Sequence, residues 1–182
     1  MINLPGFGQE DFIAFNDHVI ELPDKVLDPE FPTLFVYEAE LFVDASGKSG
    51  LRDGDSGKFW VKIPNWYENE ADPYEEILIE LRGYRFDTHE MRKRYPKSVR
   101  KRYSKEELKA MRAKERKLAI RDRNFVENLL LNKRFVIIYR HKHFNYRYGK
   151  GRWVVTFLFE DGETLKEKLE AKGYTTGKYT DK

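Results

Sequence analysis

The sequence predicts an α+β fold in which five β-strands form a small barrel and one long helix separates the third strand from the fourth. Three observations lead to this prediction. Short runs rich in β-branched and aromatic residues recur along the chain and are typical of strands. A long stretch with helical spacing begins at a capping signature in the middle of the chain. A short second helical stretch follows the last strand-like run.

The first three strands are expected close together along the chain. Residues 34–43 are aromatic and β-branched, and residues 58–63 and 76–82 alternate apolar and polar side chains. The segment between the first two, residues 45–57, is rich in Gly, Ser and Asp, which predicts a turn or loop. Three strands with short connections favour a meander that curls into a barrel.

The long helix is predicted to begin after Ser104 and to end near Leu130. Ser104 and Glu107 have the spacing of a capping box, in which each residue satisfies a backbone N–H of the other. Apolar residues at helical spacing fall on one face of this helix. They are Leu108, Met111, Leu118, Phe125 and Leu129.

The last elements are two strands and a short helix. Residues 134–139 and 152–159 are typical of strands, and residues 141–151 between them predict a turn region. Residues 163–171 predict a short C-terminal helix, with Gly173 just past its end. Five strands with a helix between the third and fourth are compatible with an OB-type β-barrel.

We expect one domain at residues 34–182, preceded by an N-terminal extension at residues 1–33 that packs on the core. Four prolines break up this extension. Cysteine is absent, which excludes disulfides and thiolate metal sites. No signal peptide and no apolar run long enough to span a membrane are evident, so we expect a cytoplasmic protein that does not associate with membranes. We also expect a monomer.

Charge is distributed very unevenly along the chain. Residues 1–90 carry 7 Lys and Arg against 20 Asp and Glu, whereas residues 91–123 carry 15 against 4. An acidic half beside a basic half fits metal ligands next to a surface that binds a polyanion. Two solvated faces of opposite sign are the alternative.

One stretch, residues 77–90, combines three side chains that a phosphodiester-cleaving enzyme could use. The alternation in its first half predicts a strand, and Arg82 lies near the end of that strand. A planar guanidinium such as that of Arg82 binds phosphate in a fork. Asp87 offers hard oxygen ligands to a metal ion, and Glu90 could accept a proton from water.

The spacing of Arg82, Asp87, Thr88 and Glu90 resembles the R-x-x-x-x-D-T-P-E core of the thermonuclease family, also called staphylococcal-nuclease-like. His89 stands where that family usually has proline. The run D-G-D-S at residues 53–56 is similar to the D-G-D-T of the family. The run at residues 148–163 is similar to its Y-G-R segment and the D-G that follows. The resemblance covers roughly residues 34–178.

This resemblance implies a calcium-dependent nuclease that hydrolyses phosphodiester bonds of DNA or RNA. One calcium ion would be held by Asp55, Asp87 and the carbonyl of Thr88. Glu90 would activate water, and Arg82 would be the first phosphate-binding arginine. The second would be Arg152, with Lys150 as the alternative, because Gly149 to Gly151 carry an insertion relative to Y-G-R.

Further residues are expected to contact nucleic acid. The basic segment after Glu90 can follow the phosphate backbone, and a tyrosine near the second arginine can stack on a base. These residues are Arg92, Lys93, Arg94, Tyr148 and Lys150.

Several alternatives remain open at this point. Asp44, which also ends a strand, competes with Asp55 as the first metal ligand, and either could be an ordinary turn aspartate. A catalytically inactive OB-fold module that binds nucleic acid or protein is the main alternative to an enzyme. A structural or assembly protein is the third possibility.

Overall fold

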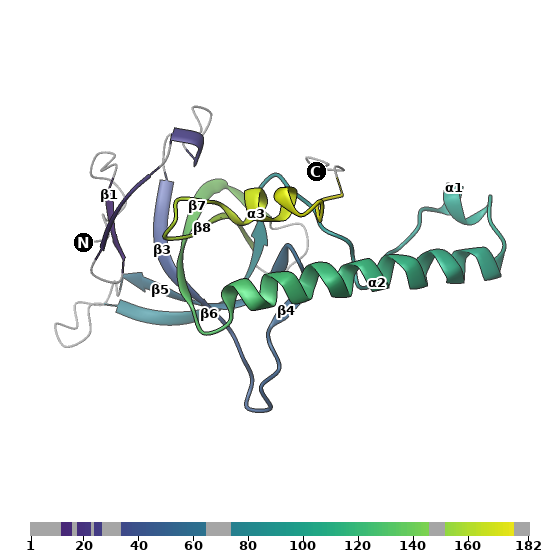
Figure 1. The fold of residues 1–182 in the computed structure, drawn as a ribbon, viewed down its shortest axis with the longest axis horizontal. Helices are drawn as coiled ribbons and strands as arrows, with labels where there is room; N and C mark the ends of the chain where they lie inside the picture. Colours follow the sequence, from purple (N-terminus) through teal and green to yellow (C-terminus); the bar gives the residue numbers. More distant parts are fainter. Residues whose placement is uncertain are drawn as a thin grey trace.

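The structure is a computed structural model that describes residues 12–15, 18–22, 24–26, 34–64, 74–145 and 152–176. These residues form a six-stranded mixed sheet, a long helix and short helices (Figure 1). The predicted α+β class is confirmed. No helix among the described residues is both long and apolar enough to cross a membrane.

The six strands form a sheet that closes on itself. Its order is β3-β7-β8-β6-β5-β4, and β3 also pairs with β5, so five strands make a ring and β4 extends from β5. All pairs are antiparallel except β6 with β8, which run parallel. The strands are β3 (Leu34–Leu41), β4 (Leu51–Asp53), β5 (Ser56–Pro64), β6 (Tyr74–Gly83), β7 (Arg134–Asn145) and β8 (Arg152–Leu158).

Aromatic side chains fill the inside of the ring. Phe59, Phe135 and Phe157 are almost completely buried, with ring centroids 5.4 to 5.9 Å apart. Because side chains alternate along a strand, burial of Leu81 inside the ring turns Glu80 and Arg82 to its outer face. The packing of the core therefore decides which face of β6 presents Arg82.

Helix α2 (Lys105–Leu130) packs on the ring with its second half only. Ser104 and Glu107 form the predicted capping box. Ala119, Val126 and Leu130 are fully buried, whereas Leu108 is the only buried residue of the described first half. This first half extends away from the ring and has α1 (Lys97–Arg100) beside its far end (Figure 1).

The predicted apolar face of α2 is buried to different degrees along the helix. Leu108 is buried and Phe125 and Leu129 pack against the core, whereas Met111 and Leu118 are only half-buried. The buried residues of the second half are Ala119, Asp122, Val126 and Leu130, and one of them, Asp122, is charged.

Three other local expectations need correction. The predicted loop at residues 45–57 contains β4, because the turn at Gly54 and Asp55 folds Leu51 back onto Gly57. The predicted turn region at residues 141–151 instead begins with strand, since β7 continues to Asn145. Residues 146–151 lie outside the described residues. Helix α1 had no predicted counterpart.

The short helix α3 (Leu165–Ala171) follows β8 as expected. Thr164 and Glu167 form its capping box, and Gly162 and Gly173 at its two sides have φ of 76° and 67°, where glycine is favoured. The chain then turns back toward the ring. The backbone N–H of Thr176 donates to the carbonyl oxygen of Asp87 at 2.9 Å.

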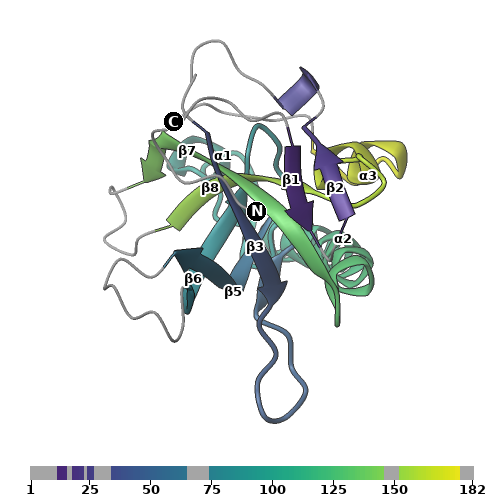
Figure 2. The same cartoon turned by 90° about the vertical axis from the view of Figure 1, so that its left-hand side faces the viewer.

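Part of the N-terminal segment also contacts the sheet. β1 (Phe12–Phe15) and β2 (His18–Glu21) form a separate hairpin, and the 3-10 helix η1 (Asp24–Val26) follows. Leu22 and Val26 are buried in one cluster with Val136, Ile138 and Leu158 of β7 and β8. Figure 2 views the molecule from the side on which this hairpin lies.

Candidate functional site

The candidate site lies where the β4–β5 turn meets the end of β6. Strand register places Ser56 opposite Arg82, so Asp55 comes beside the end of β6. The backbone N–H of Gly83 donates to the carbonyl oxygen of Asp55 at 2.7 Å, which fixes the turn to this strand. The loop that leaves β6 carries Asp87 and Thr88 past the same turn.

The guanidinium of Arg82 contacts two carboxylates from separate parts of the chain. Its Nε lies 3.8 Å from Oδ2 of Asp55, and its Nη2 donates to Oδ1 of Asp87. The buried hydroxyl of Thr88 donates to Oδ1 of Asp55 at 3.4 Å. Four of the residues singled out in the sequence, Arg82, Asp55, Asp87 and Thr88, therefore lie in one place.

Burial makes the carboxyl of Asp55 an unusually weak acid. Desolvation raises its pKa to about 7, Arg82 opposes this effect, and the nearby charges of Asp53 and Asp87 add to it. Burial also raises the pKa of Asp53, and the charge of Glu90 contributes in the same direction. The acids thus influence one another, and additional positive charge at this place would be favourable.

The donor set of this site suits a hard cation. Two carboxylates and a backbone carbonyl, from Asp55, Asp87 and Thr88, supply only oxygen atoms, as calcium prefers. The raised pKa of Asp55 indicates a buried carboxyl that one guanidinium compensates incompletely. Among the described residues, no three His, Asp or Glu side chains lie close enough together to hold a metal ion. The ligands expected from the sequence include only two such side chains, those of Asp55 and Asp87. Their oxygen atoms are of the ligand type that calcium prefers.

Glu90 lies at the edge of the site and is half exposed. Its side chain pairs with Lys93 at 3.4 Å, and its backbone N–H donates to Oε1 of Glu115 on α2 at 3.3 Å. We call Asp53, Asp55 and Asp87 the acid cluster. The charge of Glu90 contributes to the raised pKa of Asp53, so Glu90 lies near this cluster. Glu90 is therefore open to solvent near Asp53.

Arg152 lies on the neighbouring strand and pairs with an acid that sequence reasoning missed. Its Nε is 2.9 Å from Oε1 of Glu80, and Nη2 of Arg52 is 2.8 Å from the same oxygen. Register places Arg152 beside Glu80 and Val154 beside Arg82. Paired residues share a face, so Arg152 is on the same outer face as Arg82, nearer the start of β6.

A second acid that the sequence did not indicate anchors the loop of the site. Asp122, fully buried on α2, contacts the imidazole of His89 at 2.7 Å and accepts hydrogen bonds from Arg121 at 2.6 and 2.9 Å. The backbone N–H of Met91 donates to Asp53 at 2.8 Å. An aspartate in a charged helix is usually solvated, so no pattern pointed to Asp122.

The remaining sequence candidates are placed as follows. Arg92 and Arg94 are exposed and Lys93 is half-buried, all directly after Glu90. Tyr148 and Lys150 lie outside the described residues. Asp44, the alternative to Asp55, accepts hydrogen bonds from Ser46 and Lys48 within its own turn.

Neither a scan against protein-family models nor a search of curated proteins finds a match to this chain. Function is therefore inferred from the side chains and their contacts. The observation with most chemical content is the convergence of Asp55, Arg82 and Asp87.

Proposed function

We propose that this protein is a calcium-dependent nuclease that hydrolyses phosphodiester bonds of DNA or RNA. The observation that carries the proposal is the contact of one guanidinium, that of Arg82, with the carboxylates of Asp55 and Asp87. These residues come from a turn, a strand and a loop. Together they supply negative charge for a metal ion and positive charge for a phosphate group. Oxygen ligands can hold a cation, and the guanidinium can bind phosphate.

We also propose that the ring of strands is an OB-type barrel. Five strands, β3, β5, β6, β7 and β8, close the ring, and α2 connects the third of them to the fourth. This arrangement supports the expected topology. OB-type barrels commonly bind oligonucleotides on their surface, which agrees with a site on the outer face of β6.

Asp55, Asp87 and the backbone carbonyl of Thr88 would hold the calcium ion. When bound, the ion supplies positive charge that offsets the charge of a phosphate and of the buried carboxylates. Thr88 additionally orients Asp55, because its hydroxyl donates to Oδ1 of that residue. Asp53, with its backbone partner Met91, holds the neighbouring loop in place.

Each remaining step of the hydrolysis is assigned to a particular side chain. Glu90, half exposed beside the acid cluster, accepts the proton of the attacking water on its carboxylate. The water oxygen forms a bond to phosphorus while the bond to the leaving oxygen of the nucleotide breaks, and the leaving oxygen takes a proton from solvent. Arg82 donates to a non-bridging phosphate oxygen as negative charge increases there. Arg152 lies on the same outer face and is paired with Glu80. It would also bind a phosphate oxygen once this ion pair is broken.

One observation favours a second candidate function, a non-catalytic nucleic-acid-binding module. Arg152 is paired with Glu80, and Glu90 is paired with Lys93, so two groups assigned to chemistry are engaged with other side chains. A module of this kind would retain the basic surface and bind nucleic acid without cleaving it.

A cleavage assay separates the two functions. Purified protein is incubated with an end-labelled DNA or RNA strand in calcium and, separately, in chelator. We expect cleavage only with calcium, and a loss of about 10²-fold or more in Glu90→Gln and Arg82→Ala. Matched controls are Glu170→Gln and Arg134→Ala, which change exposed residues away from the site and should retain activity.

Circular dichroism of every variant establishes that the fold is intact. Binding of the strand without cleavage in any divalent cation would favour the module. Full activity of Glu90→Gln or Arg82→Ala would reject the roles given to these side chains.

A further inference from the structure

A basic groove lies between the chain that follows Glu90 and one face of α2. Its volume is about 410 Å³, which is within the range of sites that hold small ligands. One wall is the segment after the candidate site, and the other is the extended part of the helix. The lining residues are Met91, Arg92, Lys93, Arg112, Ala113, Arg116, Lys117 and Ile120.

Five of these eight residues are cationic. Lys93 pairs with Glu90 and Glu115, at 3.4 and 3.9 Å. For the other four cations, no Asp or Glu in the part of the chain that the structure describes lies within 4.0 Å, the distance of an ion pair. These four are Arg92, Arg112, Arg116 and Lys117, and all are exposed. The groove therefore offers four positive groups to an external anion.

The groove continues directly from the candidate site. Glu90 is followed by Met91, which both lines the groove and donates its backbone N–H to Asp53 of the acid cluster. This continuity favours a ligand with charges repeated along a chain.

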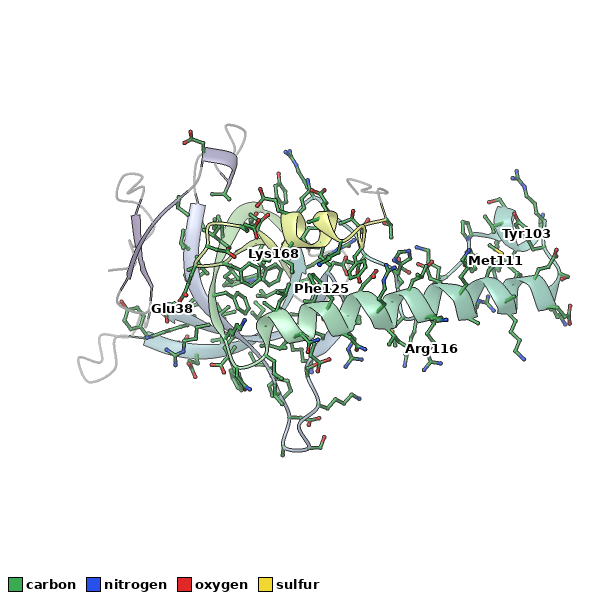
Figure 3. The ribbon with its side chains drawn as sticks, viewed as in Figure 1. Glu38, Tyr103, Met111, Arg116, Phe125 and Lys168 are labelled. Atoms are coloured by element: carbon green, nitrogen blue, oxygen red, sulfur yellow. The ribbon has the colours of Figure 1, made fainter. Side chains whose placement is uncertain are left out.

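Helix α2 provides the length that such a ligand needs. The residues of α2 that line the groove run from Arg112 to Ile120, a rise of roughly 12 Å at 1.5 Å per residue. Figure 3 shows Met111 and Tyr103 on the side of α2 that faces α1 and Arg116 on the other side.

We propose that this groove binds the phosphodiester backbone of the nucleic acid, next to the stretch that occupies the candidate site. The inference rests on the proposed function, because the site identifies the anion as a phosphodiester. Arginines, three of the five cations, match phosphate oxygens with paired N–H donors. A membrane surface fits less well, because only Met91, Ala113 and Ile120 of the lining are apolar.

Binding is measured in chelator, so that cleavage is not required. Fluorescence anisotropy of a labelled 20-nucleotide strand is recorded at several salt concentrations. The groove variant combines Arg112→Gln, Arg116→Gln and Lys117→Gln. The matched control combines Lys114→Gln, Lys133→Gln and Lys172→Gln, which remove the same charge from exposed positions outside the groove.

We expect the groove variant to bind about 10- to 100-fold more weakly than the control. The slope of log affinity against log salt should decrease in magnitude by about two, as expected when three phosphate contacts to a single strand are lost. A variant with Arg112→Lys and Arg116→Lys keeps the charge and should bind within a few-fold of the unmodified protein. Circular dichroism verifies that each variant is folded.

Equal affinity of the groove variant and the control would overturn the inference, whatever the cleavage assay shows. The inference would also be overturned if the groove variant lost binding of polyglutamate or of anionic vesicles but kept its affinity for the strand. Groove-dependent binding in a protein that never cleaves would support the groove and reject only the nuclease.

Discussion

Asp122 holds His89 at two points. Oδ2 of Asp122 accepts a hydrogen bond from the backbone N–H of His89 at 3.3 Å and lies 2.7 Å from its Nδ1. The other oxygen of this buried carboxylate accepts two hydrogen bonds from Arg121. The loop between Thr88 and Glu90 is therefore attached to α2 through His89. His89 stands where the thermonuclease family, which this sequence resembles, usually has proline.

Removal of this attachment should destabilise the protein. In Asp122→Ala the backbone N–H of His89 loses its acceptor and Arg121 loses its partner, so the free energy of unfolding should fall by about 3 kcal/mol. Urea denaturation measures the loss. Hydrogen exchange should show faster opening of residues 87–91 than of the ring.

Asp161→Ala is the matched control for this change. Asp161 pairs with Lys168 at the exposed surface, and loss of such a pair costs about 1 kcal/mol or less. Asp122→Asn should fall between the two, because its amide oxygen can still accept from His89. Equal losses in Asp122→Ala and Asp161→Ala would contradict the anchoring role.

Stability without divalent cations should decrease as pH rises from about 4 to about 7. The pKa of Asp55 is raised from 3.8 to about 7 in the fold, so in this window the folded protein binds a proton that the unfolded chain has released. A difference of one in pKa between the folded and unfolded states corresponds to about 1.36 kcal/mol, so the decrease should be on the order of 4 kcal/mol. Urea titrations at several pH values measure it.

Asp55→Asn should remove this slope and be more stable than the unmodified protein above pH 7 in chelator. Calcium should reverse the order, because it stabilises only the protein that retains the Asp55 ligand. Melting temperatures with and without calcium check this prediction. A parallel calcium response in both proteins would exclude Asp55 as a ligand.

Gly83→Ala should displace the loop that carries Asp87. A Cβ at this position would lie 2.2 Å from two ring carbons of Phe86, which is buried in the core. Overpacking of this kind costs about 1–3 kcal/mol. In Gly83→Ala combined with Phe86→Leu the loss should be smaller than the sum of the single losses, and denaturation of all four proteins tests this. Strict additivity would show that the two positions do not clash.

Glu80→Gln should loosen the arginines on the outer face of β6. Glu80 pairs with both Arg52 and Arg152, so loss of its charge should lower the free energy of unfolding by about 1–2 kcal/mol. Because Arg152 would then be available to phosphate, affinity for a labelled strand should rise about threefold. Glu38→Gln, whose cationic partners lie at 3.9 and 4.0 Å, is the control with smaller effects.

Much of the fold could be predicted from local patterns. Alternation and caps placed the five ring strands and both predicted helices, because these signals arise from residues a few positions apart. The three-residue strand β4 was missed, because a run rich in Gly, Ser and Asp is also what a loop requires. The departure of the first half of α2 from the ring was missed for another reason, since an apolar spacing does not reveal whether the ring extends along the whole helix.

The candidate site was predictable where its residues share a short segment. Arg82 and Asp87 are five residues apart, and the structure joins them directly. Glu80 and Asp122 could not be anticipated, because a charged residue on a strand or helix usually faces solvent. Their roles depend on Arg152 and His89, which only the folded chain brings beside them.

The parallel pairing of β6 with β8 has a consequence for how the protein folds. These strands are separated in sequence by α2 and β7, so the ring closes only after a large loss of chain entropy. Asp55 and Arg82 come from the antiparallel pair β5–β6 and can meet earlier. During refolding, calcium uptake should therefore precede the docking of Arg152, and a cation could accelerate the slow final closure.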